Sequence, residues 1–248
     1  MERVAAIIVG AQRTGKTFFC EKQLESYARK GGVSVVYNVG RPGDFNKFIP
    51  VSILTVDEWV EKYRIKNGKN PSFSEIPRQV EFFKIGEKVF PLKDFCKMFR
   101  GKCVKIERVI SGKYRSEDFF ISAIYKYFYN TFIVFDDCRV IFRKGLSSEM
   151  CGLLSRINHS GKKYAQKVEN IGIDIALVYH YFKAINEESY AYANLVVQFS
   201  TVFAPKLPIS ADEIEPQVLE NYQKLADSEK YCHIEYNLLT QENTFFAP

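Results

Sequence analysis

The stretch VGAQRTGKTFF, residues 9–19, determines how the rest of the chain is interpreted. Residues 10–17 match the pattern G-x-x-x-x-G-K-[ST] without a gap. In this pattern the glycines let backbone N–H groups turn inward around the α and β phosphates of a nucleotide, the lysine reaches the β and γ phosphates, and the hydroxyl binds Mg²⁺. The stretch therefore predicts a phosphate-binding loop with ATP and Mg²⁺ as its ligands.

The residues of this loop have separate expected roles. Lys16 is expected to act on the transferred phosphate, and Thr17 to bind the metal. The whole loop surrounds the phosphates with Gly10, Ala11, Gln12, Arg13, Thr14, Gly15, Lys16 and Thr17. The flanks agree, because residues 4–9 are typical of a buried strand and residues 17–30 of a helix whose positive end points at the same anion.

The order of elements predicts an α/β fold. VSVVYNV, residues 33–39, is a second apolar strand, so the chain begins with a βαβ unit, which implies a mostly parallel central sheet flanked by helices. Other strands are predicted at residues 102–110, 131–138, 171–179, 193–200 and 231–237, and other helices at 55–63, 92–99, 115–129, 146–158 and 216–226, with Ser147 or Ser148 capping the fourth of these.

Residues 41–130 are less regular, because prolines interrupt the apolar pattern throughout their first half. Within them, residues 62–78 are polar and rich in turn-forming residues, which predicts an exposed excursion. We expect one domain over residues 1–248 that contains this region as an insertion between the second strand and the strand at 131–138.

TFIVFDDC, residues 131–138, is an apolar strand that ends in two acids, the expected form of the second nucleotide motif. Asp136 is expected to hold Mg²⁺, and Asp137 to orient or deprotonate the attacking water. His180 follows the strand at 171–179. If that strand lies between the phosphate-loop strand and the Asp136 strand, His180 emerges beside the γ-phosphate as a sensor.

Arginines follow the acids at Arg139, Arg143 and Arg156. An arginine of one subunit can reach the γ-phosphate of the next, where it stabilises charge in the transition state. Arg156, at the end of the helix predicted at 146–158, is the preferred candidate for this role.

Composition sets further limits. There are 35 lysines and arginines against 29 acids, an excess that mildly favours an anionic partner. Three basic clusters could follow a phosphate backbone: Lys62, Arg64, Lys66 and Lys69; Arg100, Lys102, Lys105 and Arg108; and Lys162, Lys163 and Lys167.

Six cysteines without a C-x-x-C pair argue against a zinc cluster or a disulfide framework. The apolar runs are too short for a signal peptide or membrane span, so we expect a soluble protein.

Taken together, the phosphate loop near residue 10, the strand ending in FDD, LLSRI, GIDIALVYH and ANLVVQFST resemble the FtsK/HerA superfamily. Within it the chain is similar to genome-packaging ATPases of tailless double-stranded DNA viruses with an internal membrane. The resemblance implies a RecA-like sheet, a pentameric or hexameric homo-oligomeric ring that threads double-stranded DNA, a viral portal or membrane protein as partner, and a location in the host cytoplasm or the virion.

Two residues depart from that resemblance. Many motor ATPases have Glu where this chain has Asp137, and the family often has Gln where it has His180. Three alternatives to a motor stay open: an assembly ATPase like the zonula occludens toxin group, which usually has a membrane span; a small P-loop kinase, in which the two phosphate motifs often lie on adjacent strands; and a nucleotide-gated binding protein with little turnover.

Overall fold

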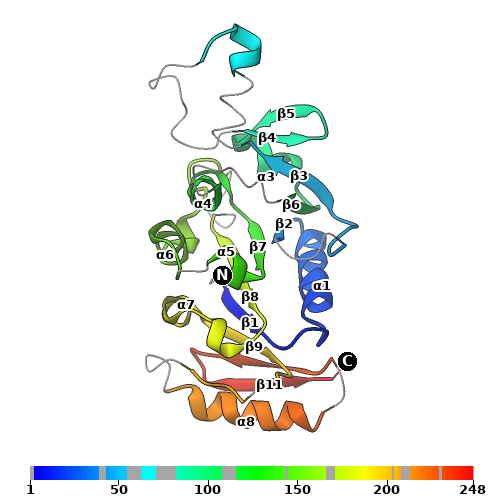
Figure 1. The fold of residues 1–248 in the computed structure, drawn as a ribbon, viewed down its shortest axis with the longest axis vertical. Coiled ribbons are helices and arrows are strands. Elements are labelled where there is room, and N and C mark those ends of the chain that lie inside the picture. Colours follow the sequence, from blue (N-terminus) through cyan, green and yellow to red (C-terminus); the bar gives the residue numbers. More distant parts are fainter. Residues whose placement is uncertain are drawn as a thin grey trace.

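The structure is a computed structural model that describes residues 3–38, 43–54, 63–70, 82–107, 116–142, 145–165, 171–202, 204–207, 213–228 and 231–247. Its described strands form one 11-stranded sheet in the order β11-β10-β9-β1-β8-β7-β2-β6-β3-β4-β5. Helices cover both faces of this sheet (Figure 1). The predicted α/β class is confirmed.

The centre of the sheet is parallel. All neighbouring strands from β9 to β3 pair in parallel, whereas β10, β11, β4 and β5 pair antiparallel at the two ends. The parallel strands are β1 (Ala5–Val9), β2 (Val33–Asn38), β3 (Ile49–Ile53), β6 (Cys103–Glu107), β7 (Thr131–Asp136), β8 (Ile173–Tyr179) and β9 (Leu195–Phe199). The antiparallel strands are β4 (Phe82–Ile85), β5 (Lys88–Pro91), β10 (His233–Asn237) and β11 (Glu242–Phe246).

Both faces of the central strands are buried, which explains their continuous apolar runs. Along β1, Ala5, Ile7 and Val9 pack into one core, and Ala6 and Ile8 into a second. This division follows from the alternation of side chains along a strand. Because every residue of β1 is buried, the strand holds the start of the phosphate loop in a fixed position.

The two cores lie under different helices. α1 (Lys16–Arg29) packs Cys20 and Leu24 against one face, while α4 (Ser116–Tyr127), α6 (Ser148–Leu154) and α7 (Glu187–Tyr192) lie on the other (Figure 1). α8 (Glu215–Ala226) packs on β9 and β10. Shorter elements are η1 (Leu92–Asp94), α3 (Phe95–Met98), α5 (Cys138–Ile141), η2 (Ile157–His159) and η4 (Phe182–Ala184).

The predicted elements match the described ones with shifted ends. The helix predicted at 146–158 is shorter, since α6 ends at Leu154, and Ser147 is its cap: its side chain accepts a hydrogen bond from the Met150 N–H at 3.3 Å. The helix predicted at 55–63 lies almost wholly outside the described residues, as does most of the excursion at 62–78. The part described, residues 63–70, is exposed apart from the half-buried Tyr63.

Four strands and two helices were not predicted: β3, β4, β5 and β11, and α5 and α7. Within the described ranges, no helix has the length and apolar character that crossing a membrane requires.

Candidate nucleotide-binding site

The loop between β1 and α1 has the backbone that a phosphate-binding loop needs. Gly15 has a φ of 103°, a left-handed conformation that side chains other than glycine rarely adopt. A Cβ placed on Gly10 would lie 2.5 Å from the Cβ of Phe199 in β9. The Ala11 N–H donates to the Ser200 carbonyl at 2.8 Å. Both glycines of the motif are therefore required by geometry, and β9 fixes the loop from one side.

Lys16 lies folded inside this loop. Its Nζ donates to the carbonyls of Gly10 and Ala11, each at 2.6 Å, and its side chain is only 6% exposed. Thr14 closes the loop through a 2.8 Å bond from its Oγ1 to the Ala11 carbonyl. Thr17 is half-buried in the first turn of α1, while Gln12 and Arg13 are exposed at the tip of the loop. The ammonium group thus occupies the interior of the loop, where an anion would bind.

The two acids lie at the same edge of the sheet as the loop. Asp136 ends β7, and Asp137 follows with a φ of 55°, a left-handed conformation that aspartate tolerates better than most residues. β8 lies between β1 and β7, with Val9 opposite Tyr179 and Phe135 opposite Leu177. Because all three strands are parallel, their carboxyl ends bring the loop, the acids and residue 180 together.

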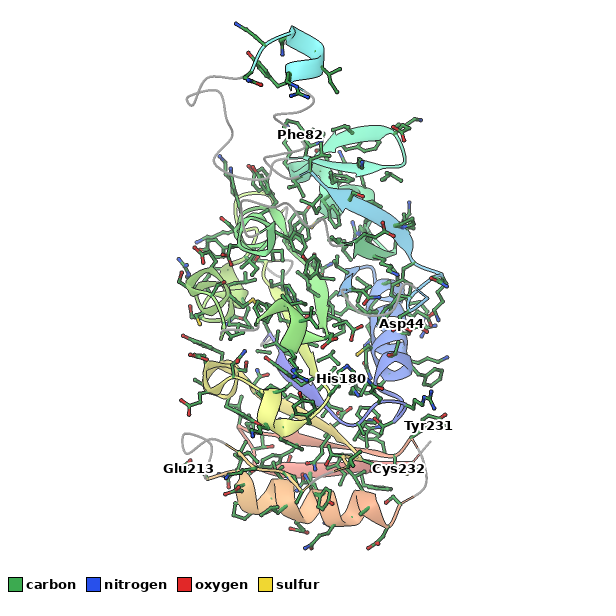
Figure 2. The ribbon with its side chains drawn as sticks, viewed as in Figure 1. Asp44, Phe82, His180, Glu213, Tyr231 and Cys232 are labelled. Atoms are coloured by element: carbon green, nitrogen blue, oxygen red, sulfur yellow. The ribbon has the colours of Figure 1, made fainter. Side chains whose placement is uncertain are left out.

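His180 lies where the sequence placed it. β8 separates the phosphate-loop strand from the Asp136 strand, which is the condition for a sensor position. The His180 Nε2 is 3.9 Å from Oδ1 of Asp137, so the two form an ion pair when the histidine is protonated. His180 therefore borders the residue expected to orient water, and Figure 2 shows it at the centre of the molecule near the end of β1.

A third acid at this edge, Asp44, was not predicted. It lies in the loop after β2, which pairs with β7, and its charge helps to raise the pKa of Asp136. The loop is fixed: Phe45 is buried at 1% exposure, and Lys105 Nζ donates to the Asp44 carbonyl at 2.8 Å. The only signal in the sequence is an aspartate shortly after an apolar strand, and strand order is needed to interpret it.

Lys47 attaches the same loop to α1. Its Nζ lies 3.0 Å from Glu21 Oε2 and 2.6 Å from Glu25 Oε1. The Asp44 loop, α1 and the end of β7 consequently form one connected unit around the site.

The pKa values of Asp136 and Lys16 indicate that the site carries excess negative charge. Burial, followed by the charges of Asp44 and Asp137, raises the pKa of Asp136 to about 6. Burial lowers the pKa of Lys16 to about 8, although the nearby Asp136 opposes this change. The charges of Asp136 and Asp137 act on Lys16, and that of Asp44 acts on Asp136, so negative charge exceeds positive charge among these groups.

This donor set fits Mg²⁺, which prefers carboxylate and hydroxyl oxygens and usually keeps several waters. Asp136 and the Thr17 hydroxyl would hold it. When bound, Mg²⁺ would supply positive charge that stabilises the phosphate groups during phosphoryl transfer. With the ion in place, Lys16 would bind phosphate oxygens and Asp137 would orient a water, which are the roles that the sequence predicts for them.

Arg156 does not join these residues. Its guanidinium lies over the Tyr125 ring at 4.7 Å, and its Nε donates to the Gly152 carbonyl at 2.9 Å. The following residue, Ile157, lies close to Gly172, just before β8 starts, which is the opposite edge of the sheet. The role that the sequence predicts for Arg156, to reach the γ-phosphate of a neighbouring subunit, stays a prediction.

Arg139 lies nearer the acids. It is exposed, two residues after Asp137, and its guanidinium lies over the ring of Tyr181 at 5.3 Å. Tyr181 directly follows His180. Arg143 lies outside the described residues. Of the other two candidates, Arg139 is the one at the edge of the sheet where the phosphate loop and the acids lie.

The basic clusters are only partly suited to binding DNA. Lys105 is buried at 8% exposure and holds the Asp44 loop, so the prediction that it could contact a phosphate backbone is wrong. Arg64, Lys66 and Lys69 are exposed, as are Lys102, Lys162 and Arg100. Lys62, Arg108 and Lys167 lie outside the described residues.

Solved structures of viral packaging proteins share this fold. The genome packaging NTPase B204 from Sulfolobus turreted icosahedral virus 2 in complex with ATP-gammaS has a TM-score of 0.58 at 12% identity, over 99% of this chain and 97% of that chain. Its complex with AMP gives a TM-score of 0.56 at 12% identity, over 100% and 99% of the two chains.

The crystal structure of B204, the DNA-packaging ATPase from Sulfolobus turreted icosahedral virus, gives a TM-score of 0.51 at 15% identity, over 98% of this chain and 96% of that chain. No protein-family model matches the sequence, and no curated protein matches it either. At these identities the likeness establishes the fold over the full chain, which confirms the expected P-loop NTPase architecture.

Proposed function

We propose that this chain is an ATP-hydrolysing translocase of double-stranded DNA that packages a viral genome. The observation that carries the proposal is the arrangement of the carboxyl edge, where β8 lies between β1 and β7 and presents His180 to Asp137. The likeness of the whole chain to structures of viral packaging NTPases supports it. The chemistry is phosphoryl transfer from ATP to water with Mg²⁺.

In this proposal the residues act in sequence around the γ-phosphate. Lys16 exchanges its bonds to the Gly10 and Ala11 carbonyls for bonds to phosphate oxygens. Asp137 orients a water for attack, and His180, which borders Asp137, acts as the sensor of the γ-phosphate. Since Asp137 is one methylene shorter than glutamate, closure of the site by a neighbouring subunit would bring the water within its reach.

The arrangement of strands argues against a small P-loop kinase. Such kinases often place the two phosphate motifs on adjacent strands, whereas here a complete strand separates them. Hydrolysis also needs water held at the γ-phosphate, which Asp137 and His180 can do at the 3.9 Å between them. We accordingly favour water as the acceptor.

The partners follow from the same proposal. Double-stranded DNA would bind the exposed basic residues, and neighbouring copies would form a pentameric or hexameric ring around it. A viral portal or membrane protein would anchor the ring in the host cytoplasm or the virion. The exposed Arg64, Lys66 and Lys69 offer positive charge for the DNA.

Arg139 and Arg156 give opposite expectations when the transition-state charge comes from an arginine. Arg139→Ala is expected to lower the rate of ATP hydrolysis about tenfold, because the guanidinium lies near the acids at the end of β7. The loss is modest because solvent and salt screen the charge of an exposed side chain. Arg156→Ala is expected to leave the rate of a single subunit near wild type, because Arg156 lies at the opposite edge of its own sheet. Steady-state phosphate release measures both rates. A loss confined to Arg156→Ala would support Arg156 as the arginine that acts on the γ-phosphate of a neighbouring subunit.

The experiment that tests the function is ATP hydrolysis with and without long double-stranded DNA. The translocase predicts that DNA increases turnover and that the increase declines with salt as phosphate contacts weaken. A kinase instead predicts slow phosphate release that rises when a small hydroxyl-bearing acceptor is added. Turnover that responds to an acceptor and ignores DNA would reject the proposal.

A further inference from the structure

Tyr231 is an aromatic residue at the phosphate loop that the roles above do not use. A Cβ placed on Gly15 would lie 2.9 Å from Cδ1 of Tyr231 and 3.6 Å from its Cβ, so the tyrosine lies against the glycine before Lys16. Tyr231 is also 51% exposed. Figure 2 shows it beside the N-terminal end of α1. One side of the ring thus contacts the loop, and much of the rest faces solvent.

The backbone of Tyr231 adopts a conformation that a bulky residue rarely has. Its φ is 79°, in the left-handed region that favours glycine and asparagine. Strained residues of this kind persist only where the surrounding structure fixes them, and they concentrate at sites of function. The fold therefore holds a large ring beside the phosphate loop although the local backbone favours a small residue.

The direction of a bound nucleotide leads toward this ring. Asp136, Asp137 and His180 lie at the carboxyl ends of β7 and β8, on one side of β1, and the proposed function places the γ-phosphate beside them. Tyr231 precedes β10, which pairs with β9 on the other side of β1. If the loop binds the α and β phosphates between these two sides, the nucleoside would extend away from the acids, toward β9 and β10.

A rigid aromatic cluster supports the segment that carries Tyr231. His233 stacks on Phe199, with ring centroids 5.1 Å apart, and Phe19 packs against both rings at 4.8 Å and 5.7 Å. The Phe199 ring also approaches Gly15, since its Cε1 lies 3.7 Å from a Cβ placed there. The start of β10 is thereby fixed relative to the phosphate loop.

Two apolar side chains on the elements that flank the phosphate loop are exposed. Phe18, in the first turn of α1, is 63% exposed, and Val202, in the loop that follows β9, is 73% exposed. Flat apolar and aromatic surfaces are what nucleotide bases bind, because each base presents a π-face. The position of Tyr231 beside the loop and its half-exposed ring therefore suit a base.

We propose that the ring of Tyr231 stacks on the base of the bound nucleotide and positions it at the phosphate loop. This inference rests on the proposed ATP site and identifies the base-binding residue of that site. Since stacking does not depend on the hydrogen-bonding edge of the base, ATP and GTP should depend on Tyr231 to a similar extent.

The test compares a ligand that has a base with one that lacks it. Isothermal titration with Mg²⁺ would measure the affinity of the full chain for ADP and for inorganic tripolyphosphate. Tyr231→Ala is expected to lower the ADP affinity about tenfold and to leave tripolyphosphate binding unchanged. Tyr231→Phe, which keeps the ring, should bind ADP like wild type, and Leu239→Ala, an exposed apolar residue at the β10–β11 turn, is the matched control.

Tyr231→Gly keeps the experiment decisive if the alanine variant folds poorly, since glycine suits a positive φ. It should show the same loss for ADP with an unchanged circular dichroism spectrum. An equal loss for ADP and tripolyphosphate would mean that the ring only shapes the loop, and an unchanged ADP affinity would exclude stacking; either result overturns the proposal. Wild type that binds neither ligand would instead reject the nucleotide site itself.

Discussion

Lys16→Ala is expected to reduce ATP hydrolysis roughly a thousandfold, to the background of the assay. The Lys16 ammonium is buried and donates to two carbonyls inside the loop at 2.6 Å, so it lies ready to bind phosphate oxygens. Removing one preorganised donor of this kind costs about 10² to 10³ in rate. Phosphate release at saturating ATP measures the loss, and titration with ADP measures the accompanying loss of affinity.

Lys30→Ala is the matched control for this variant. Lys30 is exposed at the C-terminal end of α1, so its removal takes away one positive charge from the same helix without touching the loop. Its turnover should equal that of wild type. If Lys16→Ala folds and keeps wild-type turnover, the loop between β1 and α1 does not hold the reacting phosphate.

Asp136→Asn is expected to abolish Mg²⁺-dependent hydrolysis while making the protein more stable. The carboxylate would hold the ion, and its loss removes the charge that neutralises the metal. Its pKa is raised to about 6 from 3.8, so the folded state binds the proton more tightly than the unfolded chain. Above pH 6 the ionised group then destabilises the fold, by on the order of 2 to 3 kcal/mol at the full shift.

The pH dependence gives this prediction a clear sign. At pH 7.5 the asparagine variant should melt several degrees higher than wild type, and the difference should shrink as pH falls through 6 and vanish below about 4. Asp227→Asn, an exposed acid at the end of α8, should show no such difference. A variant that melts lower than wild type at pH 7.5 would contradict the account of a half-buried carboxylate whose charge destabilises the fold.

Much of the site was predictable because its signals are local. Gly10, Gly15 and Lys16 form one continuous pattern, and the acids follow an apolar strand directly. The position of His180 was predictable only as a condition, since periodicity identifies a strand but not its neighbours. The sheet order meets that condition by placing β8 between β1 and β7.

The residues that sequence reasoning missed depend on contacts between distant segments. Asp44 reaches the site because β2 pairs with β7, and Tyr231 because β10 pairs with β9 next to the loop. Neither strand pairing can be predicted from the sequence around Asp44 or Tyr231. The missed strands have separate causes: β11 is exposed along its whole length, and in β3 the alternation of Ile49, Val51 and Ile53 covers only five residues and is interrupted by Pro50.

The measurement that tests the central claim most directly is wild-type ATP turnover against the length of double-stranded DNA, at equal total base pairs and at low and moderate salt. A translocase that tracks the backbone predicts turnover that rises with DNA length until dissociation limits it, weakens with added salt, and disappears in Lys16→Ala. Turnover that is the same without DNA and at every length, while still requiring Lys16, would contradict the claim that hydrolysis at this site drives movement along DNA.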